Sequence, residues 1–255
     1  MKVKSISLKI LTILATLGFL LVICITAFLI PASSQSFYKK QFEKHDTLNK
    51  VLSQEYVVGI KGRTYLRTLD DEKLLILIDG VLDYCVGKTD TMQPKGANGE
   101  LVELFNKQEV SHLGDVRRFF IGTFIAGGIG FAFFIAGLII ALVNKKFYYE
   151  HARRYPLYTL LAFAVLVLAI GVFAIIDFNK IFYVLHTLFF DGNFAFNYGV
   201  MINLIGDIFA PMAIISIPII IGFIATFTVL IILYNRKLKK RFLVKKINQS
   251  LQETV

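Results

Sequence analysis

Four long apolar runs constrain this 255-residue chain more than any other feature. They cover about residues 8–30, 119–143, 156–176 and 211–233. A helix needs roughly 20 apolar residues to cross about 30 Å of hydrocarbon, so each run can span a membrane. The first run could also be a signal peptide, but it is longer than the usual apolar core of about 7–15 residues, and we interpret it as a retained anchor. The sequence therefore predicts an all-α membrane protein with four transmembrane helices, forming a single integral membrane domain over residues 1–255.

The basic residues gather in three places: the N-terminus, the loop 144–155 and the C-terminal tail. These segments hold 14 of the 28 Lys and Arg residues, opposed only by Glu150 and Glu253, so they carry a formal charge of +12. The rest of the chain then carries −2 of the total +10. Because cytoplasmic loops carry an excess of Lys and Arg, we predict that both termini and this loop face the cytoplasm. The clustering also argues against nucleic acid as a partner, since no recognition motif accompanies it.

Two segments are left for the extracytoplasmic side. Residues 31–118 are charge-balanced, with apolar residues at helical spacing in 36–52 and 64–86 and a loop composition in 89–99. From Glu100 we predict a helix that runs unbroken into the second span, because no proline intervenes. Residues 177–210 are rich in Phe, Asn and Gly, which indicates a re-entrant or interfacial element.

Small residues are concentrated in the second span. Its glycines are Gly122, Gly127, Gly128, Gly130 and Gly137. Such residues let transmembrane helices approach each other closely, and this is the reading we favour. The alternative is a groove that admits a lipid chain.

His112 and Asp115 are candidate active groups just before the second span. Three residues apart on a helix, they share one face, so the carboxylate can hydrogen-bond the imidazole and fix its tautomer. At about 1.5 Å of rise per residue, His112 lies roughly 10 Å before Phe119, near the outer interface. The alternative is an exposed histidine beside an Asp115–Arg118 pair, and spacing alone does not decide between the two.

His186 is the second candidate, within the sequence FYVLHTLFFDGNFAFNYG. Polar groups at membrane depth usually need a partner, so His186 is either a functional group or a satisfied packing residue. His45 on a Lys-rich stretch and His151 in the loop 144–155 are weaker candidates. The sequence has no HExxH pattern and no Cys/His cluster, and we expect neither a metal ion nor a cofactor.

ELFNKQEVSHLGDVRRFF precedes a span, and LHTLFFDGNFAFN stands between two later spans. In this order the motifs resemble the lipoprotein intramolecular transacylases, the Lit family of bacterial four-span proteins. The resemblance extends over nearly the whole chain through FYKKQFEKH and GVLDYCVGKTD. The family has a His followed by Asp and Val, and later a His followed by a Phe pair, which are matched here by His112, Asp115, Val116, His186, Phe189 and Phe190. The chain departs from the family at Phe194, where Trp is usual, and at Asn197, where an Asp-Pro pair begins.

The resemblance implies an enzyme that moves the sn-2 acyl chain of a diacylglyceryl lipoprotein to the α-amino group of its N-terminal Cys. Diacylglyceryl-modified lipoproteins would be the substrate, within membrane lipid and without a cofactor. The implied catalytic residues are His112, His186 and Asp115, and the implied substrate-binding residues are Phe189, Phe190, Asn193 and Asn197. Both histidines would then lie at the extracytoplasmic face, where the ester carbonyls of the substrate are found.

Two other classes of function remain open from the sequence. One is a membrane lipid hydrolase or an acyltransferase acting between two molecules. The other is a non-enzymatic membrane adaptor whose outer segment binds a protein. The sequence does not report the oligomeric state, the client lipoproteins or which histidine is base and which acid.

Overall fold

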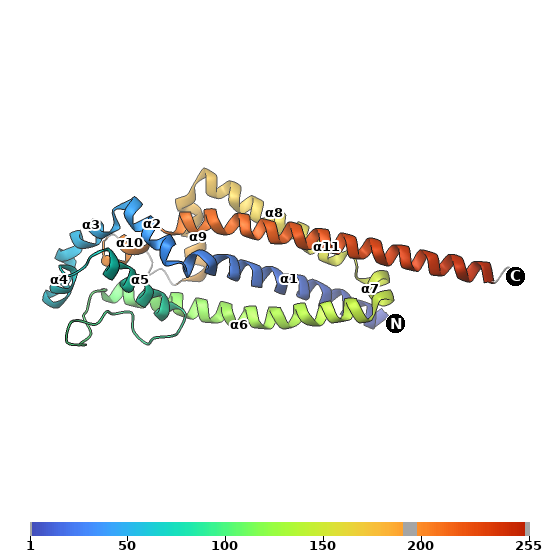
Figure 1. Cartoon of the computed structure of the whole chain (residues 1–255), viewed down its shortest axis with the longest axis horizontal. Helices are drawn as coiled ribbons and strands as arrows, with labels where there is room; N and C mark the ends of the chain where they lie inside the picture. The colour runs from blue at the N-terminus through green and yellow to red at the C-terminus, as the bar shows by residue number, and fades with distance from the viewer. Residues whose placement is uncertain (1, 191–197, 253–255) are drawn as a thin grey trace. The chain divides into compact units, whose positions relative to one another are not determined.

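The computed structural model describes residues 2–190 and 198–252 (Figure 1). Within these residues the chain is built from helices, joined by turns and one isolated antiparallel bridge between Lys95 and Leu101. The elements in chain order are α1 (Lys2–Ala32), α2 (Gln35–His45), α3 (Thr47–Leu52), the 3-10 helix η1 (Ser53–Val57), α4 (Ile60–Leu66), α5 (Asp71–Cys85), α6 (Lys107–Val143), α7 (Lys145–His151), α8 (Tyr155–Ile176), α9 (Phe178–Phe189), α10 (Val200–Ile205) and α11 (Phe209–Gln252).

Four of these helices are long and apolar enough to cross a membrane. They are α1, α6, α8 and α11, and each contains one of the four predicted apolar runs. The prediction of an all-α membrane protein with four spans is therefore confirmed. Helices α6 and α11, with 37 and 44 residues, are much longer than a span requires. Their polar ends, residues 107–118 and 234–252, lie outside the apolar runs, which we take as the membrane-spanning segments.

The contacts divide the chain into two compact units. Unit 1 comprises Met1–Ala27, Ile125–Ile176 and Ile217–Val255, and unit 2 comprises Phe28–Phe124 and Asp177–Ser216. Unit 2 thus contains both of the segments assigned from the sequence to the extracytoplasmic side, 31–118 and 177–210. Helices α1, α6 and α11 each have residues in both units. The division of the chain into domains is not decided by this, and a single integral membrane domain over residues 1–255 stays a prediction.

In unit 1, three glycines of α6, Gly127, Gly130 and Gly137, lie against α1. A Cβ added to Gly130 would lie 2.9 Å from the Cα of Gly18, and one added to Gly127 would lie 2.7 Å from the Ile25 side chain. Gly128, in contrast, faces open space. The close approach of two helices through small residues is therefore confirmed.

In unit 2, short helices enclose the main apolar core. Asp70 caps α5 by accepting the N–H of Lys73 at 2.8 Å, and the buried side of α5 then presents Leu74, Ile78 and Val81 to that core. Helix α2 packs against α3 and α5, and α3 packs against α10. The stretch 36–52 breaks at Asp46, whose left-handed backbone separates α2 from α3. Likewise, the stretch 64–86 contains the end of α4 and all of α5 rather than one helix.

The prediction of a helix from Glu100 is wrong by about two turns, because α6 begins at Lys107. Gln93 causes the difference. Its side-chain oxygen accepts the N–H groups of Leu104 and Phe105 at 2.8 and 3.0 Å, and its amide donates to the Phe105 carbonyl at 2.8 Å. These bonds hold residues 104–105 against Gln93 of the loop 89–99, so the backbone groups that a helix would use are already paired.

Candidate active site

The first turn of α6 sets the position of His112. Asn106 precedes the helix, and its side-chain oxygen accepts the N–H of Glu109 at 3.0 Å. In return, the Glu109 carboxylate accepts the N–H of Asn106 at 2.8 Å, which forms a reciprocal capping box. His112 follows Glu109 by three residues on the same face, and the structure buries it to 6% exposure. The alternative of an exposed histidine is therefore wrong.

His186 is fixed by its own helix. Helix α9 starts after Asp177, whose carboxylate accepts the N–H of Lys180 at 2.9 Å. The Nδ1 of His186 lies 2.9 Å from the carbonyl oxygen of Phe182, and the two rings pack with centroids 3.7 Å apart. A carbonyl only accepts, so Nδ1 carries the hydrogen. In the neutral imidazole the lone pair then sits on Nε2, the arrangement that a general base requires.

The two candidate histidines, 74 residues apart in the chain, lie together in unit 2. Their ring centroids are 6.2 Å apart and their planes are inclined by 28°. The ring of Phe190 contacts both, at 5.2 Å from His112 and 5.4 Å from His186. The other two histidines are placed elsewhere. His45 Nδ1 lies 3.9 Å from Asp207, and His151 bonds through Nδ1 to the Phe147 carbonyl in unit 1.

Aromatic side chains continue from the histidine pair along α6. Phe119 lies 5.8 Å from Phe190 and 5.1 Å from Phe189, measured between ring centroids. Phe119 and Phe189 are 38% and 52% exposed, so an incoming hydrocarbon chain can reach them. Phe190, which was predicted to contact substrate, therefore lies beside both histidines. Phe189, predicted to do the same, packs on Phe119. Asn193 and Asn197, the other two residues of that prediction, lie outside the described residues.

The electrostatics of His112 combine three influences. Burial, with a further contribution from the nearby His186, lowers the pKa of His112 below its ordinary value, and the Asp115 carboxylate opposes this by raising it. Asp115 itself accepts a hydrogen bond from Arg118. This is the pair that the sequence offered as the alternative to a bond between Asp115 and His112. Asp115 therefore influences His112 through its charge while paired to a neighbouring cation. The net effect favours a neutral imidazole at neutral pH.

Glu109 is a site residue that the sequence reasoning missed. Its carboxylate is 1% exposed, and in addition to capping α6 it accepts the N–H of Met201 at 2.8 Å. This bond ties the helix of His112 to the segment that follows α9. Gly199 makes room for it, since a Cβ there would lie 2.9 Å from the carboxyl carbon of Glu109. The pattern Asn106-x-x-Glu109 is a helix-capping signal and could have predicted the bonds between these two residues, although not the bond to Met201.

Among the described residues, no group of three His, Cys, Asp or Glu side chains is close enough to hold a metal ion.

The family model of the lipoprotein intramolecular transacylase Lit matches residues 12–209, which is most of the chain.

The chain belongs to the Lit family. It is therefore an acyltransferase of the lipoprotein intramolecular transacylase type, as the resemblance in the two histidine motifs implied. Both histidines lie within the matched residues. A search of curated proteins, in contrast, finds no match to this Lit chain.

Solved structures of Lit share the fold. The membrane-integral lipoprotein intramolecular transacylase Lit from Bacillus cereus superimposes with a TM-score of 0.60 at 16% identity, covering 93% of this chain and 98% of that one. A variant of that protein with a histidine replaced by arginine gives 0.62 at 13% identity, covering 96% and 97%. Another with the histidine replaced by alanine gives 0.62 at 13%, covering 95% and 98%. At this low identity the likeness establishes the fold and its four-helix membrane architecture.

Proposed function

We propose that this Lit chain moves the sn-2 acyl chain of a diacylglyceryl lipoprotein to the α-amino group of its N-terminal Cys, giving a lyso-form lipoprotein. The observation that carries the proposal is the pairing of His112 and His186, with ring centroids 6.2 Å apart beside accessible phenylalanines. Proton-transfer groups and a surface for hydrocarbon are the two things that such a reaction needs at one place.

The reaction begins with a proton. The α-ammonium group of the substrate has an ordinary pKa of about 8 and must lose a proton before its nitrogen can attack. A neutral imidazole accepts that proton, and the nitrogen then forms a bond to the sn-2 ester carbonyl carbon. The bond from this carbon to the glyceryl oxygen breaks, and the imidazolium returns the proton to that oxygen. The nitrogen gives up a second proton as the amide forms, so one proton returns to the glyceryl oxygen and one is released to solvent overall. No water or cofactor is consumed, because the amine, the ester and the product belong to one molecule.

His112 and His186 share the base and acid roles in this proposal. His186 presents Nε2 with its lone pair, and the Phe182 carbonyl that holds Nδ1–H also stabilises the imidazolium. Burial keeps His112 neutral, which avoids a second positive charge beside the substrate ammonium group. Asp115 moderates His112 through its negative charge. Because nucleophile and ester are joined, holding them in a reactive geometry supplies much of the rate.

The acyl chain to be moved would lie on the aromatic side chains. Phe119, Phe189 and Phe190 form a continuous series of ring contacts that begins at the histidine pair. Burial of each CH₂ group of a chain contributes about 0.8 kcal/mol, so even a few carbon atoms on this surface orient the ester. Asn193 and Asn197 would contact the polar part of the substrate. In this proposal the site faces the extracytoplasmic side, and residues 182–197 dip into the membrane or lie along it.

The test is mass spectrometry of the N-terminal peptide of a lipoprotein from cells with the wild-type gene and with variants. His112→Ala and His186→Ala should each remove the lyso-form, since a general acid–base group typically contributes about 10²- to 10⁴-fold. The double variant should be no worse than the single ones, because both groups serve one transition state. His45→Ala and His151→Ala are matched controls that keep activity, since neither ring belongs to the pair.

The same spectra separate the alternatives. Transfer within one molecule leaves the total mass of the peptide unchanged while an acyl chain moves from glycerol to nitrogen. A hydrolase would lose the mass of one acyl chain and release a free fatty acid. An adaptor would be indifferent to both histidine substitutions. Lyso-form product at the wild-type rate from a well-expressed double variant would remove the proposed site.

A further inference from the structure

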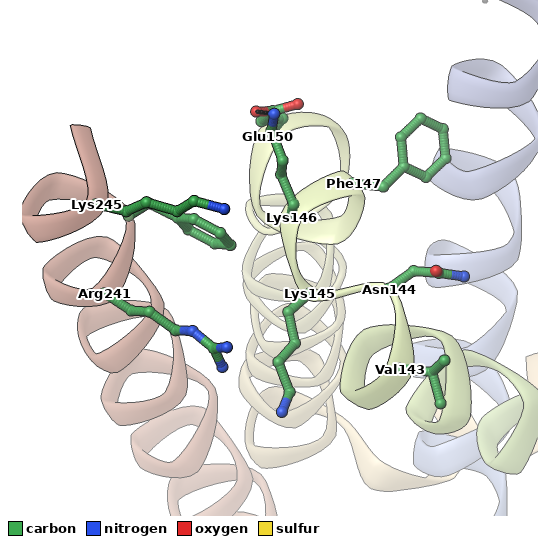
Figure 2. A pocket seen from close by; sticks show the side chains of 9 residues that line it. Val143, Asn144, Lys145, Lys146, Phe147, Glu150, Arg241 and Lys245 are labelled. Carbon is green, nitrogen blue, oxygen red and sulfur yellow. Dashed lines mark ion pairs between the residues drawn. The ribbon is translucent and has the colours of Figure 1, made fainter. Parts of the chain in front are cut away.

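A hollow of about 510 Å³ lies in unit 1, whereas the histidine pair belongs to unit 2 (Figure 2). It is bounded by the end of α6, by α7 and by the C-terminal part of α11. Its lining residues are Val143, Asn144, Lys145, Lys146, Phe147, Glu150, Arg241, Phe242 and Lys245. Figure 2 shows Arg241 and Lys245 extending from α11 toward α7, where Lys145 and Lys146 begin the short helix. Nothing in the acyl transfer reaction uses these residues.

The charge of the hollow is strongly positive. Four cationic side chains line it against the single carboxylate of Glu150, which lies 4.0 Å from Lys146. Among the described residues, no carboxylate lies within ion-pair distance of Lys145, Arg241 or Lys245. Three cations without an internal counterion, facing one space, favour an anion from outside the chain. A phosphate group suits this set, because Arg offers a planar fork of donors and Lys a compact positive charge.

The position of the hollow indicates where that phosphate comes from. Val143 is the last residue of the apolar run of α6, and Lys145 follows it by two residues. Arg241 comes eight residues after the apolar run of α11 ends, about 12 Å along a helix. The headgroup layer on each side of the hydrocarbon is about 5–8 Å thick, and long basic side chains reach back toward it. Since Val143 and Lys145 line the same hollow as Arg241, the hollow begins where the apolar run of α6 ends and is open to the headgroup layer. Val143, Phe147 and Phe242 supply apolar contacts beside its cations.

We propose that this hollow binds the phosphate headgroup of an anionic membrane phospholipid, held by Lys145, Arg241 and Lys245. The negative charge of the phosphate would bridge Lys145 on α7 to Arg241 and Lys245 on α11 and so stabilise the packing of the two helices. The site is separate from the catalytic histidines, so lipid binding and acyl transfer are measured independently.

The experiment places the full chain in phosphatidylcholine bilayers that contain a small share of phosphatidylglycerol. The protein is then extracted in mild detergent, and the retained lipids are counted by native mass spectrometry. The wild type should retain phosphatidylglycerol in preference to phosphatidylcholine. The triple variant Lys145→Gln, Arg241→Gln, Lys245→Gln should lose at least about tenfold of that preference, since one basic residue at a membrane surface contributes about fivefold. The single variant Lys245→Glu, at an exposed position, provides a milder change with the same expected direction.

A matched control removes the same amount of charge, here from α11 alone. Arg236→Gln, Lys239→Gln, Lys240→Gln also neutralises one Arg and two Lys, all exposed and none lining the hollow. This control should keep the lipid preference. An equal loss of the phosphatidylglycerol preference in both triple variants would mean that the basic surface of α11 attracts anionic lipid without a defined site, and it would overturn the proposal. Displacement of the lipid by millimolar inorganic phosphate, or by a polyglutamate peptide, would overturn it in favour of a soluble anion or an acidic protein partner.

Discussion

The imidazole of His112 experiences opposing influences from its neighbours. Burial and the adjacent His186 lower the pKa of His112, whereas Asp115 raises it, and Arg118 neutralises part of the Asp115 charge. A protonated His112 can neither accept a proton nor tolerate the substrate ammonium group nearby. Acyl transfer should therefore fall on the acidic side as His112 becomes protonated.

We predict opposite pH shifts for substitutions of the two partners. Asp115→Asn removes the carboxylate that raises the pKa of His112, so the acidic limb of the activity profile should move to lower pH. Arg118→Gln leaves the Asp115 charge without its cation, so the acidic limb should move to higher pH. The measurement is the rate of N-acylation of a synthetic diacylglyceryl peptide by purified protein across pH. Shifts in the same direction for both variants would contradict this electrostatic account.

The identities of the site residues could be read from the sequence, but their contacts could not. The His-x-x-Asp spacing placed His112 and Asp115 on one face of a helix, and that helix is present. The spacing could not tell that His112 is buried, because its cover comes from His186 and Phe190, more than 70 residues away. The foreseen alternative of an Asp115–Arg118 pair is present too, while the histidine beside it is buried rather than exposed.

At the scale of elements, the junction of α6 and α10 orients the site. The carboxylate of Glu109 accepts one N–H from Asn106 and another from Met201, and Gln54 accepts the N–H of Gly199 at 3.3 Å beside it. Gly199 has a φ of +143°, a conformation that side chains with a Cβ rarely adopt. The junction therefore depends on one buried acid and one glycine.

We predict that Glu109→Ala destabilises the protein and reduces acyl transfer although both histidines remain. Loss of a helix cap costs about 0.5–2 kcal/mol, and leaving the buried N–H of Met201 unpaired costs about 1–3 kcal/mol. Glu109→Gln keeps one acceptor oxygen and should lie between the alanine variant and the wild type. Thermal unfolding in detergent and the peptide assay would measure both effects. Glu103→Gln, at an exposed acid, is the control, and an Ala variant as stable as this control would refute the assignment.

A second prediction concerns the packing of α1 against α6. Gly130→Val introduces a side chain where Gly18 already lies within 2.9 Å, and overpacking of this kind costs about 1–3 kcal/mol. The unfolding temperature should fall. Gly128→Val adds the same side chain two residues away, where nothing lies within 4 Å, and should change it little. Equal effects of the two substitutions would mean that helix propensity, rather than close approach, decides the outcome.

The limits of the sequence at this scale have physical causes. Apolar runs predicted the four long helices well, because a membrane requires helices of a known length. Helix ends were less predictable, since Gln93 and Asn106 decide where α6 begins through bonds that periodicity does not record. Gly80, a weak helix former, nevertheless lies inside α5, where packing of the neighbouring apolar residues outweighs its weak propensity.

At the scale of the whole molecule, the chain alternates between segments of different charge. Spans one and two are separated by 31–118, and spans three and four by 177–210, so these two segments share one side of a four-span protein. Their residues form one compact unit with the histidine pair inside it, as a shared side requires. The basic segments belong to the other unit. The charge of each segment and the number of spans between segments could thus predict which segments share a side of the membrane. The fold within unit 2 could not be predicted in this way, because it depends on contacts between residues far apart in the sequence.

We predict that residues 89–99 lie outside the cell and the loop 144–155 inside, because +12 of formal charge is gathered with that loop. Ala97→Cys and Glu150→Cys introduce exposed thiols in these segments, and the second removes no basic residue. The native cysteines interfere little, since Cys24 lies within a span and burial raises the pKa of the Cys85 thiol to about 12, which leaves almost no reactive thiolate. A membrane-impermeant maleimide should therefore label Ala97→Cys in intact cells and Glu150→Cys only after permeabilisation. Labelling of Glu150→Cys in intact cells would reverse the topology and place the histidine pair on the cytoplasmic side, where no acyl transfer to exported lipoproteins could occur.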